Sequence, residues 1–365
     1  MKVGILTFPN SPSYGATLQM YALYKTVCKI GNDVEIINYH NSYMKAEKHI
    51  GRGRNNTVKY KIKNKISRIL HRKNYLQFRR FERNNVKTYP EKPIVKKEKL
   101  RNLSDRYDAV ICGSDQVWNP DITDSDVSYF FDFCGDKTKR ISYAASFGKK
   151  ELSEKYSCSI SRELEKFSEI SVRENSGKAI VAKIVGKEAA LVSDPIFFLN
   201  AEEWRKIEKK HPAAEGKYIL YYTVSSSAEL WRKCLDFSER NNIKIIIVGG
   251  NIIKKIANKN PMIEYAVDVS PEQWLYLVDK ASYVFTNSFH GTAFSLNFRK
   301  NFFVKYPVMY STRLEQLVTD TGMEKRVING DEELSSDNIS FEFAEEKMNK
   351  HKEFSLSFLE NALLP

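Results

Sequence analysis

The sequence lacks the features that define several common classes of protein. None of its apolar runs approaches the roughly 20 residues that a membrane-spanning helix needs. No GxGxxG fingerprint follows the first apolar run and no GxxxxGK[ST] pattern occurs, which disfavours dinucleotide dehydrogenases and P-loop enzymes. The zinc pattern HExxH is missing and the six histidines are scattered, so we expect no metal site and no cofactor.

Cysteine is scarce and gives no sign of a disulfide framework. The five cysteines are far apart, odd in number and without CxxC spacing. We interpret most of them as small core residues in a reducing cytoplasm. The N-terminus, MKVGILTF, carries one lysine and a very short apolar run, which indicates a first strand rather than a signal peptide. The expected location is therefore cytoplasmic.

Alternating strand and helix patterns run through most of the chain. Residues 2–8 predict a strand, residues 14–28 a helix and residues 34–37 a second strand, and such a unit implies a parallel sheet. The alternation resumes at residue 108 and is repeated in the second half. We predict an α/β fold with two Rossmann-like domains and a cleft between them. The predicted parts are residues 1–196, residues 197–335, and a C-terminal helix within 336–365 that braces the first domain.

Positive charge is concentrated in one segment. Residues 45–106 contain 21 Lys and Arg against 5 Asp and Glu, whereas the rest of the chain has 37 against 40. Within the segment, residues 58–81 have apolar residues near helical spacing with basic residues between them. Three interpretations are open: a solvated helix packed on the first domain, a contact for an anionic surface such as phospholipid headgroups, or a nucleic-acid site. No nucleic-acid recognition motif accompanies the charge, so nucleic acid is not the expected partner.

One histidine lies where an apolar run gives way to a helical pattern. The run at residues 283–285 predicts a strand, and His290 follows it at the start of the next helix. The carboxyl edge of a parallel sheet is where open α/β folds bind ligands, and the N–H groups of the helix favour an anion there. His290 is a candidate general acid or base, with Asn287, Ser288, Gly291 and Thr292 facing the ligand. The alternative is a histidine satisfied by backbone groups at a helix start.

Other candidates follow other predicted strands. Arg173 comes directly after residues 170–172 and offers a bidentate grip to a phosphate or carboxylate, the alternative being a surface pair with Glu174. Asp115 and Trp118 suit a sugar, whose hydroxyls need acceptors and whose apolar face stacks on rings. Alternatively, Asp115 is a carboxylate in a turn and Trp118 is a ring that covers the core. Asn10, Tyr14 and Gly15 occupy the first strand-to-helix loop and complete the expected sugar-acceptor site.

With these segments in view, the chain resembles the polysaccharide pyruvyl transferase family along most of its length. The matching pieces, in order, are GILTFPNSPSYGATLQMYAL (4–23), YDAVICGSDQVWNP (107–120), ISYAASFG (141–148), SVRE (171–174), SDP (193–195) and TNSFHGTAFSL (286–296). The resemblance implies a two-domain arrangement like that of GT-B glycosyltransferases. It also implies transfer of a pyruvyl group from phosphoenolpyruvate to two hydroxyls of a sugar, giving a cyclic ketal and phosphate.

The resemblance also implies roles for particular residues. His290 matches the family histidine and would be the general acid, and Arg173 matches the arginine of SVRE and would bind the donor. Better-characterised members carry an arginine two residues before the histidine, where this chain has Ser288. Either Arg313, Lys305 or Arg299 replaces it, or the donor differs. The expected acceptor is a glycan or a lipid-linked sugar at the cytoplasmic face of the membrane, which the segment 45–106 would contact.

Two other functions remain open from the sequence. A GT-B glycosyltransferase with a sugar-nucleotide donor keeps the fold and changes the chemistry. A non-catalytic module would bind an anionic polymer through residues 45–106.

Overall fold

The structure is a computed structural model that describes residues 1–41, 73–103, 105–249, 260–308, 311–330 and 333–364. The chain forms two compact units. Unit 1 comprises Met1–Phe198 and His351–Pro365, and unit 2 comprises Leu199–Lys350. The division follows Phe198, two residues after the predicted boundary, and it assigns the end of the chain to unit 1.

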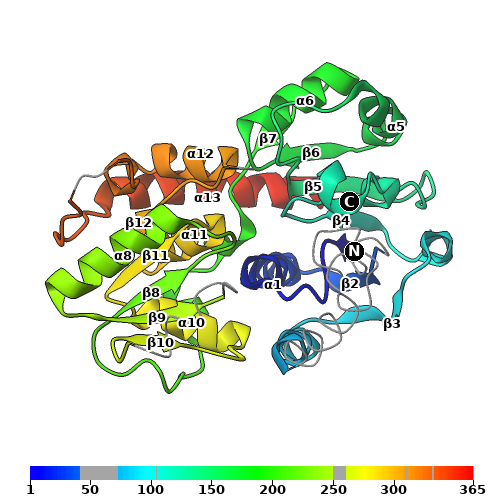
Figure 1. The fold of residues 1–365 in the computed structure, drawn as a ribbon. Coiled ribbons are helices and arrows are strands. Elements are labelled where there is room, and N and C mark those ends of the chain that lie inside the picture. Colours follow the sequence, from blue (N-terminus) through cyan, green and yellow to red (C-terminus); the bar gives the residue numbers. More distant parts are fainter. Residues whose placement is uncertain (42–72, 104, 250–259, 309–310, 331–332, 365) are drawn as a thin grey trace, which may run out of the picture. The chain divides into compact units, whose positions relative to one another are not determined.

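Unit 1 is built on a seven-stranded sheet in the order β3-β2-β1-β4-β5-β6-β7, and neighbouring strands are parallel throughout (Figure 1). Its strands are β1 (Lys2–Leu6), β2 (Asp33–Tyr39), β3 (Thr88–Ile94), β4 (Ala109–Cys112), β5 (Lys139–Ala145), β6 (Glu169–Val172) and β7 (Ala190–Leu191). Its α-helices include α1 (Tyr14–Lys29), α4 (Pro120–Thr123), α5 (Glu154–Glu165) and α6 (Asn175–Val185). Short 3₁₀ helices span Lys97–Leu103, Val127–Phe130 and Pro195–Phe198.

Unit 2 has a five-stranded parallel sheet in the order β10-β9-β8-β11-β12. Its strands are β8 (Tyr218–Tyr222), β9 (Lys244–Val248), β10 (Ile263–Tyr265), β11 (Tyr283–Thr286) and β12 (Asn301–Val304). Its helices among the described residues are α7 (Ala201–Arg205), α8 (Ala228–Asn241), α10 (Pro271–Lys280), α11 (Phe289–Asn297), α12 (Thr312–Asp320), a 3₁₀ turn (Glu324–Arg326) and the start of α13 (Glu342–Ala362). The predicted class, α/β with two parallel Rossmann-like sheets, is confirmed.

Local sequence explains the central helix of unit 1. The side chain of Ser13 caps α1 by accepting the N–H of Ala16, and Gly31 with a positive φ of 96° follows the helix end. Apolar residues lie on every side of α1, and most of its residues are buried, as expected for a helix that is enclosed by protein. This helix therefore fixes the first strand-to-helix loop from one end.

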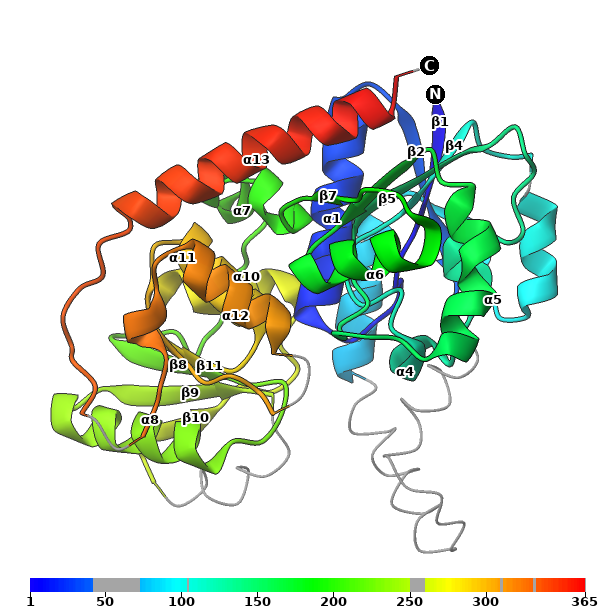
Figure 2. The same cartoon turned by 90° about the horizontal axis from the view of Figure 1, so that it is seen from above.

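The last turns of α13 pack on unit 1 (Figure 2). The hydroxyl of Ser355 accepts the N–H of Ser193 at 2.9 Å, and His351 Nε2 lies 3.0 Å from the carbonyl oxygen of Leu191. The ring of Phe358 lies 6.5 Å from that of Tyr143. Of the helices in the described ranges, none combines the length and the apolar composition needed to cross a membrane.

The basic segment is described only in its second half. Residues 58–72 of the predicted helix lie outside the described residues, and residues 73–85 are helical. The sequence did not predict β3, which follows within the same segment and lies at the edge of the sheet. Its sequence, TYPEKPI, contains two prolines, which are tolerated at a sheet edge but weaken any strand pattern.

Candidate functional site

The turn between β11 and α11 is shaped by short polar side chains. Ser288 is the N-cap of α11, and its hydroxyl accepts the N–H of Gly291 at 3.3 Å. The hydroxyl of Thr286 accepts the N–H of Ser288 at 3.0 Å. A Cβ added to Gly291 would lie 2.4 Å from Thr286 Oγ1, so only glycine fits this turn. Gly291 was expected to face a ligand, but its N–H is bonded to the hydroxyl of Ser288.

Asn287 and Thr292 also direct their side chains into the fold. Asn287 Oδ1 accepts the N–H of Val224 at 2.9 Å, and its Nδ2 donates to the carbonyl of Ser225 at 2.8 Å. These bonds join the ends of β11 and β8. The Thr292 hydroxyl donates to the carbonyl of Ser288 at 3.2 Å. The polar residues around His290 thus hold the turn in place, and their expected contacts with a donor stay predictions.

His290 lies at the start of α11 beside the ring of Phe289, and a cationic side chain packs on that ring. Its side chain is almost fully buried, and its ring stands at 88° to that of Phe289 with the centroids 5.1 Å apart. The guanidinium carbon of Arg313, from α12, lies 5.7 Å from the centroid of the Phe289 ring. The structure therefore brings Arg313 to the residue that directly precedes His290. A guanidinium over a ring is held in place by a cation–π interaction.

The two other candidate replacements for the missing arginine are occupied elsewhere. Lys305 Nζ lies 2.8 Å from a carboxylate oxygen of Glu229 and donates to the carbonyl of Ile328 at 3.1 Å. Arg299 follows the opposite end of α11 and pairs with Glu345, one of its contacts being 2.7 Å. The backbone of Lys305 also lies near this turn, its N–H donating to the carbonyl of Thr286 at 3.0 Å, but of the three cations Arg313 is the one whose side chain contacts the first turn of α11 in the described structure.

Arg173 lies in a buried ionic network within unit 1. Its Nη1 pairs with the carboxylate of Asp194 and donates to the Ser114 hydroxyl at 3.2 Å, and its Nη2 lies 3.7 Å from Asp115 Oδ1. Burial alone would lower the pKa of Arg173, but the charges of Asp194, Asp115 and Glu174 outweigh it and raise the pKa. The side chain is 2% exposed, so the alternative of a surface pair with Glu174 is wrong. The expected donor contact of Arg173 stays a prediction.

The carboxyl ends of β4, β5 and β6 share this polar network. Glu174 Oε1 accepts the Ser146 hydroxyl at 2.8 Å and the N–H of Gly148 at 3.2 Å. Asp115 has a positive φ of 85° and accepts the N–H of Gln116 on its own side chain at 2.8 Å. Sequence analysis did not single out Glu174, Ser146 or Asp194 as network members. The signal was carried by the motifs SFG, SVRE and SDP, which lie at or just after the ends of β5, β6 and β7.

Trp118 is a core residue, and its predicted role as a stacking face for a sugar is wrong. The side chain is fully buried, its ring stacks on Phe130 at 5.0 Å, and its indole N–H donates to the carbonyl of Tyr129 at 3.2 Å. An indole enclosed in this way has no open face for a sugar. The core alternative is therefore the correct one.

The first strand-to-helix loop is tied to the helix at residues 73–85. The N–H of Asn10, which has a positive φ of 57°, donates to both carboxylate oxygens of Glu82 at 2.9 Å. Asn10 Nδ2 lies 3.2 Å from Asn38 Oδ1. Tyr14 is buried with its ring 5.0 Å from that of Phe78, and Gly15 is buried in the first turn of α1. These three residues lie near one another, and acceptor binding by them stays a prediction.

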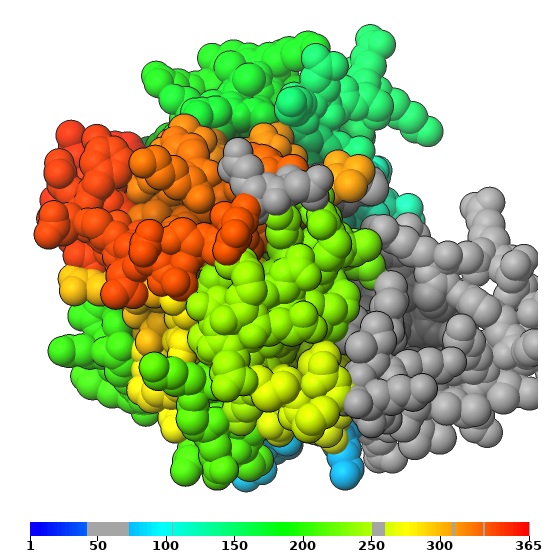
Figure 3. All heavy atoms as spheres, turned by 60° about the vertical axis from the view of Figure 1, so that its left-hand side comes forward, coloured from blue at the N-terminus to red at the C-terminus, as the bar shows by residue number. Residues whose placement is uncertain are grey.

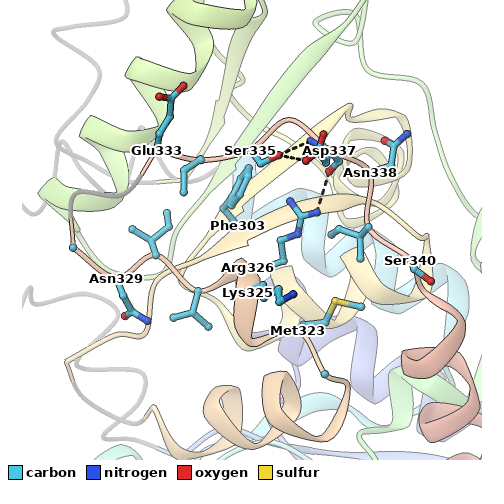
Figure 4. A pocket seen from close by; sticks show the side chains of 16 residues that line it. Phe303, Met323, Lys325, Arg326, Asn329, Glu333, Ser335, Asp337, Asn338 and Ser340 are labelled. Carbon is cyan, nitrogen blue, oxygen red and sulfur yellow. Dashed lines mark hydrogen bonds between the residues drawn. The ribbon is translucent and has the colours of Figure 1, made fainter.

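Unit 2 also has a hollow of about 490 Å³ beside β12 (Figure 4). Figure 3 shows the segment that follows α12 next to α8 on one face of unit 2. Arg326 reaches into the hollow, donates to the carbonyl of Asp337 at 2.9 Å and lies over the ring of Phe303. None of the predicted site residues lines this hollow. Within the described ranges, no group of His, Cys, Asp and Glu is placed to hold a metal ion.

Solved structures show which fold this one is similar to. A UDP-GlcNAc 2-epimerase from Methanocaldococcus jannaschii gives a TM-score of 0.51 at 13% identity, over 98% of this chain and 93% of that one. A putative UDP-N-acetylglucosamine 2-epimerase from Listeria monocytogenes gives 0.53 at 10% identity, over 99% and 88%. MnaA from S. aureus, solved with UDP, gives 0.54 at 9% identity, over 97% and 88%. At these identities the likeness concerns the fold alone, which is GT-B-like.

A family model gives the relationship that the fold cannot. No curated protein sequence matches the chain. The model described as polysaccharide pyruvyl transferase, however, matches residues 14–306, which include the first helix, the network around Arg173 and the turn at His290. Because this match covers most of the 365 residues, the chain belongs to the polysaccharide pyruvyl transferase family.

Proposed function

We propose that the protein transfers a pyruvyl group from phosphoenolpyruvate to two hydroxyls of one sugar in a cell-surface glycan, such as a capsule or exopolysaccharide, or in its lipid-linked precursor. Membership of a transferase family supports the reaction class. The observation that supports this donor is the contact of Arg313 with Phe289, whose ring also lies against that of His290 at the start of α11.

The proposed reaction balances without water or a cofactor. The C3 methylene of phosphoenolpyruvate gains a proton and becomes a methyl group, and the bond from C2 to the phosphate oxygen breaks. The two sugar oxygens form bonds to C2 and give the cyclic ketal. The sugar hydroxyls release two protons, of which one balances the proton taken up at C3 and the other leaves with the phosphate.

In this proposal His290 and Arg313 have different tasks. His290 acts as the general acid, protonating C3 or the departing phosphate, since imidazole exchanges protons near neutral pH. Arg313 binds the carboxylate or phosphate of the donor, because a guanidinium offers two parallel N–H donors to an oxyanion. Its contact with Phe289 would orient it. Asn287, Ser288, Gly291 and Thr292 keep the turn in shape, which positions His290 on a rigid element.

Phosphate release tests the proposal. Purified protein with phosphoenolpyruvate and a diol-bearing sugar acceptor should release inorganic phosphate, and mass spectrometry should show the acceptor carrying a carboxyethylidene group. His290→Ala should lower turnover by roughly 10²–10⁴-fold, the range for loss of a general acid. His211→Ala is a matched control, because His211 lies in the same unit and its Nδ1 accepts the N–H of Ala213. Normal turnover by His290→Ala would remove the histidine from the mechanism.

A sugar-nucleotide donor is the competing proposal, since two of the similar structures are described with UDP or UDP-GlcNAc. A thermal-unfolding experiment distinguishes the two proposed donors, because a ligand stabilises the folded state that it binds. Phosphoenolpyruvate should raise the melting temperature of the wild type and not that of Arg313→Ala. A rise with UDP-sugars alone would favour glycosyl transfer.

A further inference from the structure

The helix at residues 73–85 has two faces of opposite character. Phe78, Phe81 and Glu82 are buried, and the rings of Phe78 and Phe81 pack against Tyr14 and Tyr21 of α1 at 5.0 and 5.5 Å. Figures 1 and 2 show this helix, in light blue, beside α1. The helix is therefore attached to unit 1 along its apolar face.

Its other face carries three arginines and a leucine at helical spacing. Leu76, Arg79, Arg80 and Arg83 stand at positions i, i+3, i+4 and i+7, so they form one stripe. Leu76 is 50% exposed, and Arg80 and Arg83 are exposed. Glu82 lies between two of these arginines in sequence, but its carboxylate is turned inward onto the N–H of Asn10.

Within the part of the chain that the structure describes, the positive charge of this stripe has no matching negative charge. In the described part of the chain, no carboxylate forms an ion pair with Arg79, Arg80 or Arg83. The sequence offers little compensation, since residues 42–72, directly before this helix, contain ten Lys and Arg and a single acidic residue, Glu47. Like charges at helical spacing repel one another, and an anionic partner would relieve that repulsion.

The geometry points to the stripe Leu76, Arg79, Arg80 and Arg83 as a contact for an anionic lipid surface. A guanidinium donates two parallel hydrogen bonds to the oxygens of one phosphate. In the headgroup region of a membrane, the arginines would contact phosphates while the exposed leucine would enter the apolar boundary. A nucleic acid fits less well, because no aromatic side chain is fully exposed on this stripe for a base to stack on. This inference deepens the proposed function, since it places unit 1 where a lipid-linked acceptor would be found.

The attachment of the helix links this surface to the candidate acceptor loop. Glu82 holds Asn10 by two bonds from the face opposite the arginines. The loop between β1 and α1 would thus lie at a fixed distance from the lipid surface. A lipid-linked sugar bound there would need no large movement of unit 1 to reach it.

Vesicle sedimentation with the full chain tests the inference. The probes are vesicles of phosphatidylcholine alone and of phosphatidylcholine mixed with phosphatidylglycerol. Wild-type protein should sediment with the mixed vesicles, and added salt should release it. The triple variant Arg79→Gln, Arg80→Gln, Arg83→Gln should bind roughly tenfold or more weakly. Leu76→Ser should weaken binding while keeping its dependence on salt.

A matched control separates this surface from net charge. Lys155→Gln, Arg162→Gln and Lys183→Gln remove three exposed charges from α5 and α6, and this variant should bind as the wild type does. Equal loss in both triple variants, or none in either, would overturn the inference. A different pair of results would also overturn it: the wild-type protein does not bind the mixed vesicles, and the arginine variant binds duplex DNA more weakly than the wild type does. Phosphate release with a soluble acceptor should be the same in both variants, so a failure here is distinguishable from failure of the proposed function.

Discussion

Arg173 and Arg313 are both candidate anion-binding groups, one in each unit, and they differ in what surrounds them. Arg173 pairs with the carboxylate of Asp194 and lies near that of Asp115. Arg313 lies over the ring of Phe289, beside His290. A guanidinium whose neighbours are carboxylates already has its counter-charge. We therefore expect Arg173, which carboxylates enclose, to contribute mainly to the fold, and Arg313, which packs on the residue before His290, to contribute mainly to donor binding.

The largest expected effect comes from removing the counter-charge of Arg173. Asp194→Asn should lower the stability of unit 1 by about 3–5 kcal/mol, because a buried cation loses its main partner. Asparagine keeps the size of the side chain and the bond that Asp194 Oδ1 accepts from the N–H of Ile196. Hydrogen exchange of β4, β5 and β6 should accelerate, while that of β8 and β11 should not.

A double variant provides the control for this prediction. Arg173→Met combined with Asp194→Asn removes both members of the closest pair but leaves the carboxylates of Asp115 and Glu174 without the cation that they face. It should therefore be less stable than Asp194→Asn alone, in which those two carboxylates still face Arg173. If the single variant exchanges its amides at the wild-type rate, the network does not hold the strand ends, and the two arginines are more alike than we infer.

The second effect concerns Arg313, where we expect the opposite balance. Arg313→Ala should lower phosphate release from phosphoenolpyruvate by roughly 10²-fold, the scale for losing a group that stabilises charge in the transition state. The cation–π contact with Phe289 accounts for about 0.5–1 kcal/mol of the stability that this variant should lose. Steady-state kinetics and thermal unfolding measure the two quantities on the same preparation.

Arg299→Ala is the matched variant for Arg313. Arg299 lies past the other end of α11 and pairs with Glu345, so its removal should leave turnover unchanged. Equal turnover by Arg313→Ala and Arg299→Ala would show that the contact with Phe289 has no role in donor binding.

The sequence predicted the repeating units well and their contacts poorly. Strand-to-helix alternation is local, so β11, the turn at Ser288 and the helix after it could be placed from the pattern around His290. Arg173 meets Asp194 across 21 residues and Ser114 across 59, and no local pattern reports such pairs. Trp118 was misjudged for the same reason, because the rings that enclose it come from other segments.

The contact of Arg313 could not be predicted from the sequence either. Its place beside Phe289 depends on the packing of α12 against α11, which the sequence does not encode at any fixed spacing. Ser288 occupies the place of an expected arginine, and its hydroxyl is used as an N-cap. Sequence comparison could register that difference, whereas its physical meaning required the hydrogen bond.

The smallest expected effect concerns Glu208 in unit 2. It tests whether the charges around this carboxylate balance it as fully as the carboxylates around Arg173 balance that guanidinium in unit 1. Glu208 faces Asp279, Lys280, Arg205 and Lys300, and burial, aided by the charge of Asp279, raises its pKa to about 7. An unfolded glutamate has a pKa of about 4.3. Between these values the folded state binds more protons than the unfolded state, so this group lowers stability as the pH rises through that window.

Replacing Glu208 removes that dependence. Glu208→Gln should raise the melting temperature relative to wild type more at about pH 8 than at about pH 5, since only the ionised carboxylate is disfavoured by burial. Glu215→Gln, at an exposed carboxylate of the same unit, should show no such difference. The carboxylates around Arg173 are matched by a buried cation, whereas Glu208 Oε1 is buried without a hydrogen-bond partner in the described structure. An equal gain at both pH values would mean that the cations around Glu208 already balance it, as the carboxylates balance Arg173.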